Sequence, residues 1–111
     1  QFNGDIGSWN TGNVRDMSGM FSGSFFDRDI SRWNTENVRN MNTIFFDSVF
    51  NQDISGWNIG RLEEYFSIFR ISKYSGNLYN WVEQRPDLEF RNHASNPNIF
   101  NYNPLTRWIE Y

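Results

Sequence analysis

The sequence predicts an α/β repeat solenoid of about 24 residues per repeat, with short parallel strands on one face and short helices on the other. Residue types recur at a constant spacing of 24 in many columns, most clearly at Trp9, Trp33 and Trp57. Each unit also holds an aromatic-rich segment followed by a segment with apolar residues three or four positions apart. A unit this short cannot bury its own apolar side chains, so we expect the copies to stack.

The first half of each unit is predicted to be a short strand between turns. Residues 2–10, FNGDIGSWN, place Phe, Asp, Ile and Trp close together, and residues 26–34 and 50–58 repeat this order. The column Asp5, Asp29, Asp53 and Asn77 is expected to close Asx turns, since short acidic and amide side chains accept hydrogen bonds from nearby backbone. The alternative for the aspartates is a row of Ca²⁺ ligands.

The second half of each unit is predicted to be a short helix. Residues 13–21, 37–45 and 61–69 carry apolar side chains at positions i, i+3, i+6 and i+7, which lie on one face of a helix. Asn13 and Asn37 are plausible N-caps. The solenoid would then have its strands on one side and its helices on the other.

We expect a single repeat domain over residues 1–111, because the columns run through most of the chain. Residues 83–98 fit the template poorly and are predicted to be a loosened connection or a shortened helix. The chain begins inside a repeat, so we expect it to belong to a longer array. The predicted repeats are residues 2–25, 26–49 and 50–73, a degenerate repeat at 74–99 and a partial one at 100–111.

Composition and motifs exclude several functional classes. The net charge is -3 and the chain has no cysteine, so neither a nucleic-acid footprint nor a thiolate metal site is expected. It has no apolar run of about 18 residues that would span a membrane. His93 is the only histidine, and no nucleophile, phosphate-loop or dinucleotide motif accompanies it. We therefore expect no enzymatic activity, no cofactor and no metal.

Two further ladders of side chains are expected to be structural. The tryptophans are predicted to form a buried aromatic ladder, with an exposed sugar-stacking platform as the alternative. Asn10, Asn34 and Asn58 are predicted to bond to the backbone of successive turns, with a binding role as the alternative. The predicted tryptophan ladder comprises Trp9, Trp33, Trp57, Trp81 and Trp108.

The candidate ligand residues are those that vary between copies within the strand half. Such positions tend to line the open face of a solenoid, where a partner can dock. These candidates are Ser8, Arg32, Ser55, Tyr79, Asn80 and Arg107.

Two segments, FNGDIGSWNTGNVRDMSGMFSG at 2–23 and FNQDISGWNIG at 50–60, resemble the BspA-like surface-protein repeats, also called the mycoplasma-type lipoprotein repeat of unknown function. The resemblance covers residues 2–69 strongly, and 74–81 and 100–108 weakly. It implies a variant leucine-rich-repeat fold, a cell-surface or secreted location, and a role in adhesion or protein binding. It brings no catalytic residue.

The sequence therefore predicts a non-enzymatic repeat module that binds a protein or a surface ligand through its exposed strand face. The alternative is a structural component of a larger surface or virion assembly. Gln1 and Phe2 begin inside a repeat, and Trp108 and Ile109 near the other end are apolar. Because uncapped repeats expose apolar surface, neighbouring repeats or subunits are expected as partners at the ends.

Overall fold

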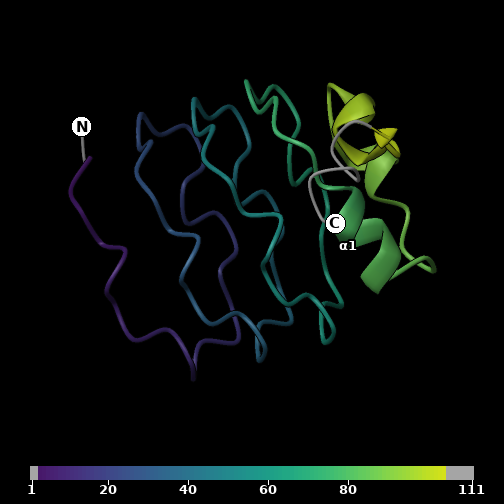
Figure 1. Ribbon diagram of the computed structural model, residues 1–111. Helices are drawn as coiled ribbons and strands as arrows, with labels where there is room; N and C mark the ends of the chain where they lie inside the picture. The colour runs from purple at the N-terminus through teal and green to yellow at the C-terminus, as the bar shows by residue number, and fades with distance from the viewer. Residues whose placement is uncertain (1–2, 105–111) are drawn as a thin grey trace.

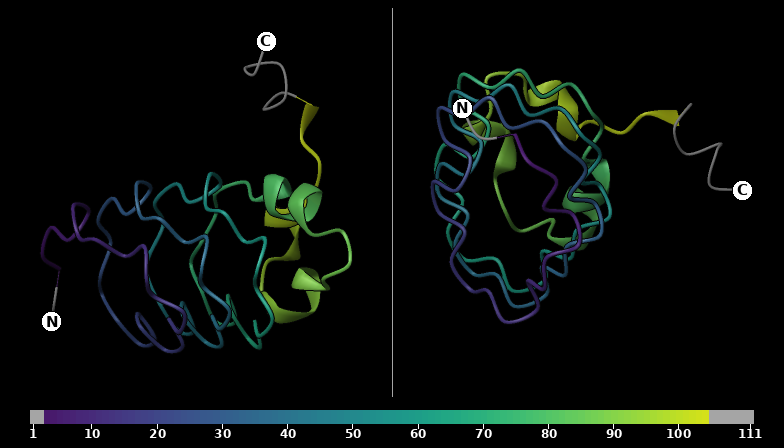
Figure 2. Two further views of the ribbon diagram at one scale, coloured as in Figure 1. Left: turned by 90° about the horizontal axis from the view of Figure 1, so that it is seen from below. Right: turned by 90° about the vertical axis from the view of Figure 1, so that its left-hand side faces the viewer.

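The computed structural model describes residues 3–104, and the chain winds through them as successive turns stacked along one axis (Figure 1). We call each turn a layer: layer 1 is residues 3–25, layer 2 is 26–49 and layer 3 is 50–73. Seen along the axis, the layers lie over one another around a shared outline (Figure 2). Residues 74–104 cover the end of the stack next to layer 3.

The predicted α/β repeat solenoid is wrong. Residues 3–104 contain no β-strand and no sheet, and their single α-helix is α1, Tyr79–Gln84. Two 3₁₀ helices follow it, η1 at Phe90–His93 and η2 at Pro97–Phe100. Backbone pairing of the β type is limited to isolated parallel bridges. The helices lie where the sequence departs from its repeat, so the leucine-rich-repeat-like architecture with strands and helices on opposite faces is not what this chain adopts.

The second halves of the units, predicted to be helices, instead join the layers through backbone hydrogen bonds. We call residues 15–23, 39–47 and 63–71 the bridge ladder. The Met17 N–H donates to the Asn40 carbonyl at 2.8 Å, and the Met41 N–H donates to the Glu64 carbonyl at 2.8 Å. Within a layer the bonds close tight turns, as from the Met20 N–H to the Met17 carbonyl at 3.2 Å. The apolar spacing therefore reflects consecutive turns rather than one helix.

Left-handed residues explain why the bridge ladder cannot be helical. Two positions in each layer have φ between 52° and 66°, a conformation that right-handed helices exclude. Glycine occupies both positions in layer 1, but layers 2 and 3 hold residues with side chains there. The residues are Gly19 and Gly23, Thr43 and Asp47, and Ser67 and Ile71.

The first halves of the units, predicted to be strands, are joined by side chains. The Asp27 N–H donates to Asn3 Oδ1 at 2.9 Å, and the Asn51 N–H donates to Asp27 Oδ1 at 2.9 Å. The Trp33 indole Nε1–H donates to the Ile6 carbonyl at 2.9 Å. Local turns also interrupt these segments, as where the Trp33 N–H bonds to the Ile30 carbonyl at 3.1 Å. Because side chains meet the backbone between layers, no strand ladder forms here.

The core between the layers consists of stacked aromatic rings. Phe26 and Phe50 lie 6.2 Å apart with an interplanar angle of 3°, and Phe50 stacks on Tyr74 at 6.2 Å. Phe45 stacks on Phe69 at 5.4 Å in a second column. Each of these side chains is at most 3% exposed. Full burial of one such side chain contributes about 1.5–3 kcal/mol, so the interiors of the layers supply much of the stability.

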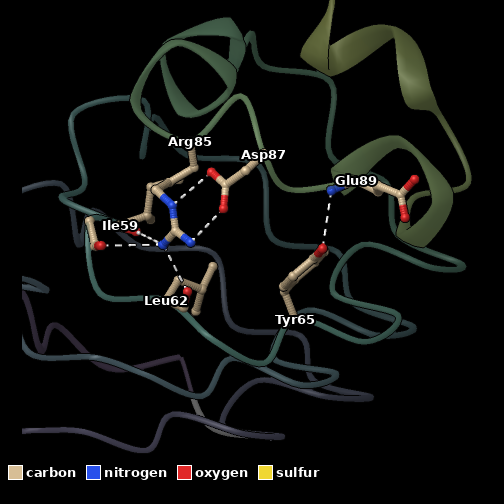
Figure 3. Close-up of polar contacts among 7 residues, drawn as sticks. Ile59, Leu62, Tyr65, Arg85, Asp87 and Glu89 are labelled. Carbon is tan, nitrogen blue, oxygen red and sulfur yellow. Dashed lines mark hydrogen bonds and ion pairs between the residues drawn. The ribbon is translucent and has the colours of Figure 1, made fainter.

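Arg85 fastens the covering segment to layer 3 (Figure 3). Its guanidinium donates to the carbonyls of Ile59 at 3.3 Å and Leu62 at 2.8 Å, and also to that of Gly60. The Asp87 carboxylate accepts two hydrogen bonds from the same guanidinium, at 3.1 and 2.9 Å. The planar guanidinium can serve all these acceptors at once, which an ammonium group cannot.

Candidate ligand face

The positions predicted to contact a ligand lie on the side of the stack formed by the first halves of the units. Ser8 and Arg32 are exposed, Ser55 and Tyr79 are half-buried, and Asn80 is exposed. Arg107 lies outside the described residues. We call the surface of these first halves the ligand face; it consists of residues 5–8, 29–32, 53–56 and 77–80.

Asx turns shape the ligand face in every layer. The carboxylate oxygens of Asp29 and Asp53 accept the backbone N–H two residues later at 2.9 Å. Asp5 forms the same bond at 3.2 Å, and Asn77 forms it at 3.0 Å. These bonds confirm the Asx turns predicted for this column. Hydrogen bonds from Ser31 are the main cause that holds the pKa of the exposed Asp29 carboxyl below its ordinary value.

A first hollow lies between layers 1 and 2 on this face. It is lined by Asp5, Ser8, Asp29 and Arg32, with Gly7 between them. Gly7 is needed because a Cβ built there would lie 2.6 Å from the Asp29 carbonyl oxygen. Two of the predicted ligand residues, Ser8 and Arg32, are thus brought together from different layers. The hollow carries charges of both signs.

A second hollow lies between layer 3 and the covering segment. Ser55 is the predicted ligand residue in it, and Tyr74 is the aromatic residue. Tyr74 is 3% exposed, and its hydroxyl oxygen is the only buried side-chain nitrogen or oxygen without a hydrogen-bond partner within residues 3–104. The full lining is Asn51, Gln52, Asp53, Ser55, Tyr74, Ser75, Gly76 and Asn77.

Desolvation of the Tyr74 phenol raises its pKa well above the ordinary value. The backbone of Ile54 opposes this shift and the Asp53 carboxylate adds to it, so both groups lie near the hydroxyl. The Ile54 N–H does not reach hydrogen-bond geometry with the phenol oxygen. The hydroxyl is therefore neutral, and its proton has no acceptor among residues 3–104.

Of the remaining candidates of the ligand face, Asn80 contacts layer 3 and Tyr79 contacts another part of the covering segment. Asn80 donates from Nδ2 to the Ser55 carbonyl at 2.8 Å. The ring of Tyr79 packs edge-on against Tyr102, with 5.3 Å between their centroids. Tyr79 follows Ser55 in the same column, one unit further along the chain.

The tryptophans stack in one column, and their burial differs along it. Trp33 and Trp57 lie 6.3 Å apart with an interplanar angle of 6°, and Trp57 and Trp81 lie 6.4 Å apart. These three rings are at most 4% exposed, whereas Trp9 is 57% exposed. Among residues 3–104, Trp9 stacks on Trp33 alone, at 6.4 Å. Trp108 lies outside the described residues.

The asparagine column makes local bonds. The side chains of Asn10, Asn34 and Asn58 each accept the backbone N–H two residues later, at 3.2, 3.1 and 2.9 Å. Threonine provides the bond to the next layer at this corner, since the Thr35 hydroxyl donates to the Asn58 carbonyl at 2.9 Å. The asparagines therefore shape turns within a layer, and the link between layers that was expected of them falls to their neighbours.

His93 lies at the end of the bridge ladder, away from the ligand face. Its Nδ1 accepts a hydrogen bond from the Ser67 N–H at 3.2 Å, and its ring meets the edge of Tyr65 at 5.3 Å between centroids. Within residues 3–104 no group of three or more histidine or acidic side chains is placed to hold a metal ion. Over the same residues, no helix has the length and apolar character that crossing a membrane requires.

Sequence reasoning missed three residues that the structure makes prominent. Tyr74 occupies the phenylalanine column, and its extra hydroxyl is the one signal that could have identified it. Gly76 follows where Gln52 and Arg28 stand in earlier units, and the loss of a side chain there leaves room for the hydroxyl. No sequence pattern identified the role of Arg85, because the carbonyl groups that accept its hydrogen bonds are distant in sequence.

Comparison with known proteins places the chain in a family. Residues 1–108 match the family described as "Mycoplasma protein of unknown function, DUF285". Searches of curated proteins and of solved structures gave no match. The family match extends through the three regular layers and the covering segment. It therefore includes both the regular repeats and the irregular residues that follow them. The chain therefore belongs to the Mycoplasma protein family of unknown function DUF285.

Proposed function

We propose that this chain is a non-enzymatic module that binds a protein or another surface ligand through its ligand face. The observation that carries the proposal is the first hollow, where Asp5, Ser8, Asp29 and Arg32 from two layers converge. Ser8 and Arg32 are exposed, and tight Asx turns hold the backbone beneath them. Polar side chains on a preorganised backbone bind at a lower cost in conformational entropy than mobile ones.

We further propose that the chain is a BspA-like repeat protein at the cell surface or in the secreted fraction, with a role in adhesion. The pattern of residues 2–69 supports this closer relationship, and so does membership of the DUF285 family. An adhesive protein gains from many modest polar contacts spread over neighbouring layers, because linked contacts raise the overall avidity.

The test is binding of the purified chain to immobilised extracellular-matrix proteins and to intact host cells. Arg32→Ala removes the one cation of the first hollow and is expected to weaken binding about tenfold, as for a lost charged contact. Arg15→Ala is the matched control, because Arg15 is also exposed but lines neither hollow. Equal binding by both variants, or no binding by the parent chain, would contradict the proposal.

The second candidate function is a structural component of a larger assembly. The open end of layer 1 favours it, because Trp9 is 57% exposed and Met20 is 43% exposed beside an apolar hollow that Ile6 and Phe21 also line. Exposed apolar surface of this kind is typical of an interaction site. Light scattering over a range of concentrations tests the idea: association that Trp9→Ser abolishes supports it, and a monomer at all concentrations contradicts it.

A further inference from the structure

The second hollow of the ligand face contains a buried group with an unused hydrogen bond. Tyr74 is 3% exposed, and its hydroxyl has no partner within residues 3–104. The same column holds Phe26 and Phe50, which fill the equivalent space without a hydroxyl. Packing in this column therefore does not require the hydroxyl. Leaving such a group buried without a partner is unfavourable, so an acceptor from outside these residues is the natural complement.

Gly76 leaves room for this hydroxyl, which lies where a side chain at position 76 would begin. A Cβ at position 76 would lie 2.6 Å from the Tyr74 hydroxyl oxygen and 2.8 Å from the ring carbon that carries it. In the preceding unit the equivalent residue is Gln52, whose side chain turns to Asp27 and bonds to it at 3.0 Å. The pairing of Tyr74 with Gly76 thus places a buried hydroxyl in the lining of the second hollow, where Phe26 and Phe50 of the same column carry none.

The groups around the second hollow fall into a fixed rim and a free acceptor. Asn51 and Ser75 bond to each other, with the Ser75 N–H donating to Asn51 Oδ1 at 2.8 Å. Asn77 accepts from the Tyr79 N–H and donates to the Asn101 carbonyl. Asp53 uses Oδ1 for its Asx turn, so its Oδ2 remains for another donor. The lining includes an acidic residue and no cationic one.

These groups define the chemistry of a ligand. It must offer an oxygen that accepts the Tyr74 proton and a hydrogen that the Asp53 carboxylate can accept. A hydroxyl pair on adjacent carbons satisfies both, whereas an ammonium group offers no acceptor and an anion is repelled by Asp53.

We propose that the second hollow binds a neutral carbohydrate through two neighbouring hydroxyl groups, with Tyr74 as donor and Asp53 as acceptor. This inference rests on the proposed binding function of the ligand face and names the ligand class for one part of it. Asn51 and Ser75, bonded to each other, form part of the rim, and Gly76 accommodates the Tyr74 hydroxyl. Arg32 and the first hollow take no part in this contact.

The experiment titrates glucose, galactose, mannose and N-acetylglucosamine, as free sugars and as short oligosaccharides, into the ¹⁵N-labelled chain, with sialic acid as an anionic comparison. Tyr74→Phe restores the residue of the neighbouring layers, and Asp53→Asn keeps an Asx-forming side chain, as at Asn77. Each is expected to weaken binding about three- to tenfold. Asp16→Asn is the matched control and should bind as the parent does, because Asp16 also forms an Asx turn, with the Ser18 N–H at 2.8 Å, but lines neither hollow.

Amide shifts over residues 51–55 and 74–77, lost in Tyr74→Phe and Asp53→Asn but kept in Asp16→Asn, support the inference. Absence of binding at millimolar sugar, equal binding by the parent and Tyr74→Phe, or a preference for sialic acid overturns it. Thermal melts show whether Tyr74→Phe remains folded. If the matrix and cell assays still distinguish Arg32→Ala from Arg15→Ala, a negative result here rejects the sugar site and leaves the proposed function standing.

Discussion

Replacement of Trp57 by alanine tests the stacked core most directly. The indole is 1% exposed and lies between Trp33 at 6.3 Å and Trp81 at 6.4 Å. Its Nε1–H donates to the Ile30 carbonyl at 3.0 Å, so the layers are linked by a hydrogen bond as well as by ring contacts. Trp57→Ala removes the ring from both neighbours and leaves the carbonyl without this donor.

The expected loss is about 3–5 kcal/mol, the range for a large aromatic side chain removed from a packed core. Within that sum, each stacked pair contributes roughly 0.5–1.5 kcal/mol beyond its buried area. A small domain has about 5–15 kcal/mol of stability in total, so a large share would disappear. With an m value of about 1–3 kcal/mol per molar, the urea midpoint should fall by roughly 1–5 M.

The assay is urea unfolding followed by circular dichroism, with Trp9→Ala as the matched control. Trp9 is the same residue type in the same column, but it is 57% exposed and stacks on Trp33 alone among residues 3–104. We expect Trp9→Ala to cost about 1 kcal/mol, close to the value of a single aromatic contact. Similar midpoints for the two variants would show that Trp57 is not enclosed between layers, and the stacking argument would fail.

The remaining predictions concern strain, the covering segment and alkaline pH. Ile71 has φ 56° and is 59% exposed, so Ile71→Asn should stabilise the fold by about 1 kcal/mol in urea melts, whereas Phe25→Asn, exposed at an ordinary φ, should not. Arg85→Lys should cost about 2 kcal/mol, because lysine cannot replace the hydrogen bonds to carbonyls and to Asp87; an unchanged melting temperature would contradict this. The pKa of Tyr74 is raised in the folded chain above the ordinary value of 10.0. The neutral phenol therefore makes its full contribution to the free energy of unfolding below about pH 10, and this contribution is lost as the pH rises above that value. Between about pH 9 and about pH 11, the free energy of unfolding should fall less in Tyr74→Phe than in the parent chain. Equal decreases would count against a buried neutral phenol.

The spacing of 24 residues was enough to predict which side chains lie beside one another. Trp33 and Trp57 stack, Phe26 and Phe50 stack, and the Asx turns at Asp29 and its equivalents form in each layer. These contacts depend on residue type and on translation along the stack, both of which are visible in a repeated sequence. The candidate residues Ser8 and Arg32 meet in one hollow for the same reason.

The backbone conformation within each layer could not be inferred from the residue pattern. Apolar residues three positions apart fit a helix and also fit consecutive turns, and only the bonds between layers distinguish them. The left-handed φ of Thr43 and Ile71 could not be predicted from the sequence, because threonine and isoleucine usually avoid that conformation. Helix α1 arises outside the regular units, where Trp81 bonds to the Ile54 carbonyl at 3.0 Å.

Residue identity thus prescribes which side chains recur and which columns they form, because translation by one unit carries each residue onto a similar one. The three-dimensional packing alone leaves the Tyr74 hydroxyl without a partner among residues 3–104 and brings Arg85 to carbonyls that lie 23 to 26 residues earlier. The physical reason is that hydrogen-bond satisfaction depends on which atoms surround a group after all layers have packed, and a local pattern of residues does not contain that information.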